Sequence, residues 1–439
     1  MPRFFRASRH IPLHTRRIVL FAALLGCAFA AGCNDGNMAG IPAADSADMG
    51  AALEAPAPVA EAMIVAEPAP VSSGRWQNPR RGVVTAGDID DALNLAAFKS
   101  YQGRTAKDLR LPQVNLRGAV RVQLTGSDGK PASGVPVTLR KPGADEPFYQ
   151  GHSGVDGWVT AFPAALGTGA PKRVQLRAFG EGQQVHDHSL PTGSPNRSTL
   201  PFNSKWQPDF LDLVFVFDTT GSMGDELSWL TKEFGGIVQA ARRSAPRANI
   251  RFGLVAYRDR GDAYVVRNFG FTNRQAQMQS WLRSLDANGG GDYPEAAAAA
   301  LQSAVGLNWR RGKGERILFH IADAPPHKSE ARAYLDAARG AAKKNIQIFG
   351  LGASGVAEES EFLMRQAALV TAGRYLFLTD DSGVGLSHAE PSTACYRVTR
   401  LKSLLVRVLQ SELSGVRKEA SDSEVLREVG TYHRGVCKQ

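Results

Sequence analysis

The sequence predicts an α/β fold in which a doubly wound, mostly parallel sheet of the Rossmann-like kind is preceded by a small all-β sandwich. Two observations predict this class. Between residues 205 and 385, apolar runs of strand length alternate with stretches of helical spacing, as a doubly wound sheet requires. Between residues 113 and 192, short alternating runs are separated by Gly, Pro and Asp turns, which is typical of a small β-sandwich.

The segment LDLVFVFDTTGSMGDE, residues 211–226, is the centre of the larger predicted domain. Its apolar run, 211–217, has the pattern of a strand buried on both faces of a parallel sheet and ends at Asp218. A loop of hydroxyl residues and glycines follows, and apolar residues then recur with helical spacing over 227–241. This strand, loop and helix place the loop at the carboxyl ends of the strands, where such sheets bind their ligands.

The other elements of this domain follow from the same patterns. We expect strands at 250–257, 264–271, 316–322, 346–351 and 374–378, and helices at 275–285, 296–304, 332–344 and 360–370.

Asp218, Thr220 and Ser222 place three hard oxygen donors on the central loop. Oxygen donors of this kind suit Mg²⁺, which keeps several waters and takes few direct protein ligands. The D-x-T-x-S spacing after a buried strand resembles the metal-ion-dependent adhesion site of von Willebrand factor type A domains. A phosphoaspartyl hydrolase would need an acid at Thr220, and a serine hydrolase elbow would need glycine there. A turn whose hydroxyls only cap the next helix stays open as an alternative.

Two further segments, GGGDYPE at 289–295 and IADAPPH at 321–327, resemble the second and third site loops of a bacterial branch of these domains. The resemblance implies that Asp292 and Asp323 approach the ion with the first three residues. Better-known members carry threonine in the second loop, so Asp292 is a departure. Asp292 as a helix N-cap and Asp323 as a turn residue are the structural alternatives. His320, within an apolar strand, is expected in the core.

The first 32 residues have the basic start and short apolar core of a signal peptide. They end in AAGC, which resembles the lipobox of bacterial lipoproteins and implies a lipid on Cys33. Because Asn34 follows in place of aspartate, the resemblance favours the outer membrane. Cleavage after Ala30, releasing a secreted or periplasmic soluble protein, is the alternative. Residues 33–74 are rich in Ala and Pro and are predicted to be a flexible tether.

Two cysteines, Cys395 and Cys437, remain after the signal and lipid positions and are predicted to pair in an oxidising compartment; two unpaired buried thiols are the alternative. The bridge would pin residues 386–439, a C-terminal extension with an amphipathic helix over 398–409.

Residues 75–112 are predicted to hold a short capped helix, spanning 85–101. Without the five arginines of the signal, 47 basic residues face 42 acidic ones, which gives no argument for nucleic-acid binding.

The resemblance implies divalent-cation-dependent protein binding by a lipid-anchored protein of the bacterial cell envelope. An Asp or Glu carboxylate of the partner would complete the shell of Mg²⁺, with Mn²⁺ or Ca²⁺ as alternatives, and Tyr293, Arg258 and Asp259 would form a selective rim. The sandwich resembles carboxypeptidase-regulatory or transthyretin-like modules, which serve as spacers. No catalytic set is evident, so we expect no enzyme. The alternative is an envelope structural protein whose metal site is vacant or only stabilising.

Overall fold

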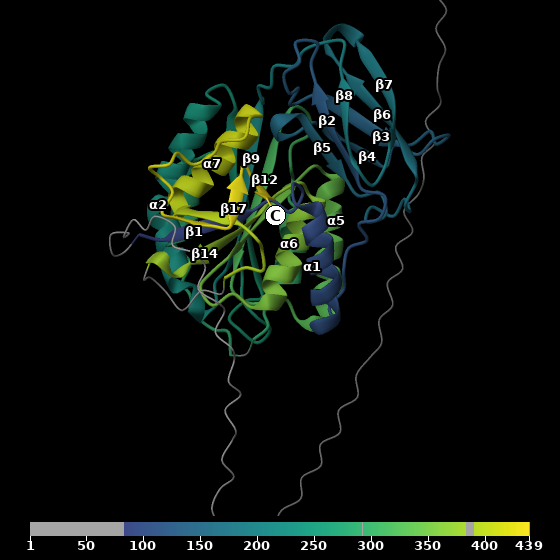
Figure 1. The fold of residues 1–439 in the computed structure, drawn as a ribbon. Helices are drawn as coiled ribbons and strands as arrows, with labels where there is room; N and C mark the ends of the chain where they lie inside the picture. The colour runs from purple at the N-terminus through teal and green to yellow at the C-terminus, as the bar shows by residue number, and fades with distance from the viewer. Residues whose placement is uncertain (1–82, 292, 383–389, 439) are drawn as a thin grey trace, which may run out of the picture. The chain divides into compact units, whose positions relative to one another are not determined.

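A computed structural model describes residues 83–291, 293–382 and 390–438. The predicted signal peptide, the tether, Cys33 and Asp292 therefore lie outside the described residues. The largest element is a nine-stranded sheet ordered β11-β10-β9-β12-β13-β14-β1-β15-β16 (Figure 1). No helix among the described residues combines the length and the apolar character needed to cross a membrane.

The centre of the sheet is parallel, and its flanks are antiparallel. The parallel strands are β9 (Phe210–Asp218), β10 (Asn249–Tyr257), β12 (Gly314–Ala322), β13 (Gln347–Gly352) and β14 (Tyr375–Thr379). The antiparallel strands are β11 (Val266–Thr272), β1 (Thr85–Ile89), β15 (Tyr396–Arg400) and β16 (Arg427–Val429). The α/β prediction is confirmed, but the described sheet is mixed, and only its centre is parallel.

Helices cover both faces of the sheet (Figure 1). One face carries α2 (Gly224–Ser244), α3 (Gln275–Arg283) and α7 (Leu401–Ser414). The other carries α1 (Leu95–Asp108), α4 (Ala297–Val305), α5 (Ala331–Lys343) and α6 (Glu358–Val370). Strand β9 contributes to the hydrophobic cores on both faces of the sheet. Phe215 packs against α2, whereas Val214 and Val216 face the helices of the opposite layer. All nine β9 residues are buried, as the apolar run at 211–217 predicts.

The prediction of a helix over 85–101 is wrong for its first part. Residues Thr85–Ile89 form strand β1, and helix α1 begins only at Leu95. Strand β1 lies between β14 and β15, antiparallel to both. Four of the five residues in TAGDI are polar or small, so the local sequence does not predict a strand, and pairing with segments about 300 residues away decides its structure.

Residues 120–199 form two further sheets. The strands are β2 (Val120–Thr125), β3 (Pro136–Arg140), β4 (Tyr149–His152), β5 (Trp158–Ala161), β6 (Arg173–Phe179), β7 (Val185–Pro191) and β8 (Pro195–Thr199). One sheet has the order β5-β2-β8 and the other β4-β3-β6-β7. Alternate residues of both sheets, such as Val122 and Leu176, contribute to one apolar cluster.

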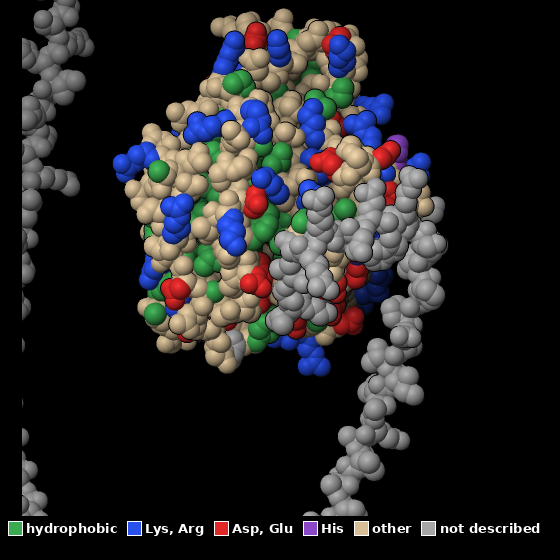
Figure 2. Space-filling model, turned by 90° about the vertical axis from the view of Figure 1, so that its left-hand side faces the viewer, with side chains coloured by type: hydrophobic (Ala, Val, Ile, Leu, Met, Phe, Trp, Pro, Cys, Tyr) green, Lys and Arg blue, Asp and Glu red, His purple; other side chains and the backbone are tan. Residues whose placement is uncertain are grey.

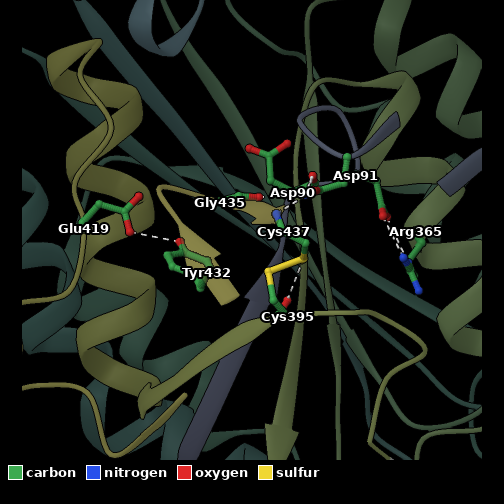
Figure 3. Close-up of a disulfide and its surroundings, with 9 residues drawn as sticks. Asp90, Asp91, Arg365, Cys395, Glu419, Tyr432, Gly435 and Cys437 are labelled. Atoms are coloured by element: carbon green, nitrogen blue, oxygen red, sulfur yellow. Dashed lines mark hydrogen bonds and ion pairs between the residues drawn. A yellow bond between two sulfur atoms is a disulfide. The ribbon is translucent and has the colours of Figure 1, made fainter. Parts of the chain in front are cut away.

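The C-terminal region contains strands as well as the predicted helix. Helix α7 packs against α2 as expected, and Cys395 and Cys437 form the predicted disulfide. Beyond β16, β17 (Thr431–His433) and β18 (Val436–Lys438) make a hairpin. Figure 3 shows this hairpin beside the disulfide, with the Tyr432 hydroxyl donating to Glu419 at 3.0 Å. The side chain of Asn94, just before α1, accepts from Cys437 N at 2.9 Å and donates to Gly435 O at 2.7 Å.

Candidate functional site

The central loop lies at the carboxyl end of β9, where Asp218 is the last residue of the strand and is fully buried. One oxygen, Asp218 Oδ1, accepts from Thr220 N at 3.0 Å and from the Thr220 hydroxyl at 2.7 Å. Burial raises the pKa of Asp218 to about 7, opposed by the Thr220 amide and raised further by the charge of Asp323. The loop therefore fixes the position of the carboxyl group, but its ionised form is electrostatically unfavourable there.

Asp323 follows the neighbouring strand β12, so the parallel register brings it next to Asp218 at the same edge of the sheet. Its backbone carbonyl accepts from Ala357 N at 3.0 Å and from the Ser360 hydroxyl at 3.1 Å. Burial raises the pKa of its carboxyl, and the Ser222 hydroxyl lies close enough to lower it. The structure thus brings together Asp218, Thr220, Ser222 and Asp323, whereas Asp292 lies outside the described residues.

Glu295 is a third buried carboxyl at this edge, and sequence reasoning missed it. Its side chain is 2% exposed, and burial together with the charge of Asp218 raises its pKa to about 9. Gly290 allows this approach: its φ is +74°, and a Cβ there would lie 2.8 Å from Glu295 Oε1 and 2.9 Å from Thr220 Cβ. The motif GGGDYPE carries two acids, and the sequence prediction includes only the first, Asp292. The second acid, Glu295, is the sequence feature that could have pointed to this carboxyl.

The donor set fits a hard cation. Among the described residues, Asp218 Oδ2, Asp323 Oδ1 and Glu295 Oε2 are buried without a hydrogen-bond partner. Buried carboxylate oxygens without partners are costly, and a divalent cation would satisfy them. The described His, Cys, Asp and Glu residues include no group of three placed to hold a metal ion by themselves, so the donor set also needs the Thr220 and Ser222 hydroxyls.

A row of buried hydrogen bonds lies behind Asp218. The Tyr257 hydroxyl acts on Asp218 as a donor and lowers its pKa, and it lies 3.1 Å from His320 Nε2. His320 Nδ1 lies 2.9 Å from the Tyr334 hydroxyl. Burial lowers the pKa of His320 to about 3, so the ring is neutral and one nitrogen donates while the other accepts. The predicted core position of His320 is confirmed, and its ring orients Tyr257 toward the carboxylate.

Of the three residues predicted to form a rim, only Tyr293 is exposed, and its contact with a partner stays a prediction. Tyr293 is 54% exposed, and its hydroxyl lies 3.1 Å from Asp323 O. Arg258 and Asp259 are each only 4% exposed and cannot contact a partner as proposed. Arg258 instead donates to Thr219 O at 3.1 Å, and Asp259 binds His327 Nε2 at 2.6 Å. Both side chains hold the loops that surround Asp218.

In excess chelator, the chain is expected to become more stable as the pH falls from about 8 to about 6. The pKa values of Asp218, about 7, and Glu295, about 9, lie above the ordinary 3.8 and 4.5, so the folded chain binds more protons than the unfolded chain in this window. Stability is therefore lost as the pH rises through it. Melting temperatures measured with chelator at several pH values test this, and a Glu295→Gln variant should show a shallower slope. A melting temperature that stays level or rises with pH would contradict the assignment.

Comparisons with known proteins identify the kind of domain that contains these residues. A family model for the von Willebrand factor A domain matches residues 212–383. The putative ariadne-like RING finger protein R811 of Acanthamoeba polyphaga mimivirus is 37% identical over 28% of this chain and 12% of its own length. The alpha-protein kinase vwkA of Dictyostelium discoideum is 26% identical over 34% of this chain and 24% of its own. The human von Willebrand factor A domain-containing protein 7 is 36% identical over 21% of this chain and 10% of its own.

The chain thus spans less than a quarter of each of these relatives. The range matched by the family model contains Asp218 and Asp323. The matched residues include β9 to β14 and the helices between them. Residues 212–383 of this α/β chain are a von Willebrand factor A domain.

Proposed function

We propose that the von Willebrand factor A domain of this chain binds a protein partner through a divalent cation. Mg²⁺ is favoured, with Mn²⁺ or Ca²⁺ as alternatives. The observation that carries the proposal is the pair of buried oxygens without partners, Asp218 Oδ2 and Asp323 Oδ1, beside two hydroxyls. A bound cation supplies the positive charge that attracts an Asp or Glu carboxylate of the partner.

The residues of this site would have two roles: some would bind the cation, and others would reduce the net positive charge that an acidic partner meets. Asp218, Thr220, Ser222, Asp292 and Asp323 would hold the cation, directly or through water. Glu295 lies close to Asp218 and is neutral at pH 7 without a cation, because its pKa is raised to about 9; once ionised beside a bound cation, it would raise cation affinity and weaken the pull on an acidic partner. Exposed Tyr293 is the candidate for contacting that partner. The sequence similarity to relatives such as the human von Willebrand factor A domain-containing protein 7 supports a protein-binding or adhesion-scaffold role.

The test is the melting temperature of the purified chain against Mg²⁺, Mn²⁺ and Ca²⁺. An ion that binds only the folded chain stabilises it by about 2.7 kcal/mol at a concentration one hundred times its Kd. We expect a concentration-dependent rise, reversed by chelator, followed by capture of envelope proteins only when the cation is present. Capture that persists in excess chelator would refute the cation mechanism.

We also propose that the chain is a lipoprotein of the bacterial cell envelope, attached to the outer membrane through a lipid on Cys33. The basic and apolar start and the AAGC sequence support this. Mass spectrometry of the membrane fraction is expected to find a lipid-modified N-terminal Cys33. An unmodified chain that begins at Ala31 would instead establish the secreted or periplasmic soluble alternative.

The two sheets of residues 120–199 would then be a β-sandwich that serves as a spacer of the carboxypeptidase-regulatory or transthyretin-like kind. We propose no enzymatic activity. The second candidate function is an envelope structural protein whose metal site is vacant or only stabilising. It is favoured by the hydrogen bonds that Asp323 O accepts from Ala357 N and from the Ser360 hydroxyl, since they give this residue a structural role without a cation. The two are distinguished by whether binding of an envelope protein depends on the cation.

A further inference from the structure

A cleft of about 890 Å³ lies at the opposite end of the sheet from Asp218. Its walls come from β4, from the linker 202–206, from the loop 307–313 that leads into β12, and from residues 343–345 at the end of α5. Since β12 begins at Gly314, this loop marks the amino end of the parallel strands, whereas Asp218 and Asp323 stand at their carboxyl ends. The cleft is therefore separate from the candidate cation site.

The lining of this basic cleft is far more cationic than the chain as a whole. Seven lining residues are Lys or Arg and one, Glu181, is acidic, whereas the full sequence has 52 basic and 42 acidic residues. His152 also lines it, but burial lowers its pKa to about 4, so it adds no charge at neutral pH. The seven are Lys205, Arg310, Arg311, Lys313, Arg316, Lys343 and Lys344. A concave surface with charges of one sign focuses the field and attracts the opposite charge.

Structural roles account for only part of this charge. Arg310 pairs with Asp212 at 2.6 Å, and Lys344 donates to Val305 O at the end of α4. Arg316 donates to three backbone carbonyls and to no carboxylate. Within the described ranges, four cations of the cleft form neither an ion pair nor a side-chain hydrogen bond: Lys205, Arg311, Lys313 and Lys343. All four are exposed.

The aromatic residues of the cleft argue against a single-stranded nucleic acid, which needs exposed rings for base stacking. Trp206 donates its indole N–H to Glu412 O at 3.0 Å. Its ring packs against the His152 ring in a T-shaped arrangement, with 4.8 Å between the ring centroids. Trp309 is 9% exposed and donates to Ala304 O. Apolar walls such as Val135 and Leu307 stand beside the cations instead. This mixture suits a peptide that carries both carboxylates and apolar side chains.

We propose that the basic cleft binds an acidic segment of a partner protein, independently of any cation at Asp218. On the face that Figure 2 shows, Lys and Arg side chains are spread singly among neutral ones. In the cleft, by contrast, cations from the linker, the loop before β12 and the end of α5 converge on one volume. Convergence on a concave site is what distinguishes a binding site from a generally basic surface.

The test uses the purified full chain in excess chelator and a fluorescein-labelled oligoglutamate peptide, with binding followed by fluorescence anisotropy. We expect binding that weakens as NaCl is raised. The double variant Arg311→Glu/Lys313→Glu is expected to lower the affinity by about tenfold or more. The matched control, Arg104→Glu/Lys107→Glu, changes the net charge equally at two exposed positions of α1 that do not line the cleft, and should leave the affinity within about twofold of wild type.

Three outcomes would overturn the proposal. Equal losses in the cleft variant and the control would show that binding follows net charge. Binding that requires Mg²⁺ would assign the peptide to the cation site. Tripolyphosphate that displaces the peptide at lower concentration than unlabelled oligoglutamate does would identify a phosphate site. The milder variant Arg311→Gln/Lys313→Gln, with its melting temperature measured in parallel, should show a smaller loss in the same direction and separates lost binding from misfolding.

Discussion

Asp218→Asn is expected to abolish the rise in melting temperature that Mg²⁺ gives the wild-type chain and to stabilise the metal-free chain. The carboxyl is fully buried beside Asp323, and its pKa of about 7 means that ionisation is unfavourable without a cation. Since one pKa unit corresponds to about 1.4 kcal/mol, the shift from 3.8 implies a cost of up to about 4 kcal/mol above pH 7. Asparagine removes that cost and keeps an oxygen for the Thr220 donors, but it loses a negative ligand.

The measurement is a pair of melting curves for each protein, with Mg²⁺ and with chelator. Asp225→Asn is the matched control, because Asp225 is an exposed acid in the first turn of α2 and has the same side chain. Its melting temperature should respond to Mg²⁺ as wild type does. If Asp218→Asn responded as strongly, the cation would bind elsewhere. If Asp218→Asn lost the response and was also less stable in chelator, the inferred cost of the buried charge would be wrong.

Removing the disulfide with Cys395→Ser/Cys437→Ser is expected to lower the free energy of unfolding by about 4 kcal/mol in the chain-entropy model. The bridge joins residues separated by 42 positions and closes a loop that contains α7, β16 and β17. The contacts of Asn94 with Cys437 N and Gly435 O are local and cannot replace a covalent closure. Urea unfolding midpoints of the two proteins measure the difference.

Reductant provides the control for this experiment. It should shift the midpoint of the wild-type chain to that of the double variant and leave the variant unchanged. Equal midpoints for the oxidised wild type and the variant would mean that the disulfide contributes nothing to global stability. An intermediate value is also informative, because the hydrogen bond between Tyr432 and Glu419, drawn in Figure 3, does not involve the sulfur atoms and can persist in the variant.

The central strand, loop and helix could be predicted from the sequence because their structure follows from local pattern. Nine consecutive buried residues in β9 and the apolar stripe of α2 leave few alternatives. The disulfide followed from the number of cysteines left after the predicted signal and lipid positions. Asp218 and Asp323 came together because parallel strands end at one edge of the sheet.

What the sequence could not provide depends on long-range contacts. Glu295 becomes part of the acidic cluster only because Gly290 permits close approach of its loop to Thr220. Arg258 looked available to a partner, but its guanidinium is used to bind Thr219 O and the loop carbonyl of Asp286. The basic cleft is lined by six segments that are separate in the sequence, and no local pattern predicts that they come together.

The position of β1 has a consequence for how this chain can fold during synthesis. The first described strand sits between β14 and β15, so the sheet cannot close until nearly the whole chain has emerged. Contacts this distant in sequence slow folding. A fragment cut to residues 212–383 would leave one edge of β14 unpaired and expose the apolar side of α6 that α1 covers, and open strand edges invite aggregation. The von Willebrand factor A domain therefore cannot be isolated as residues 212–383 alone, because β1, β15 and β16, which lie outside that range, complete its sheet.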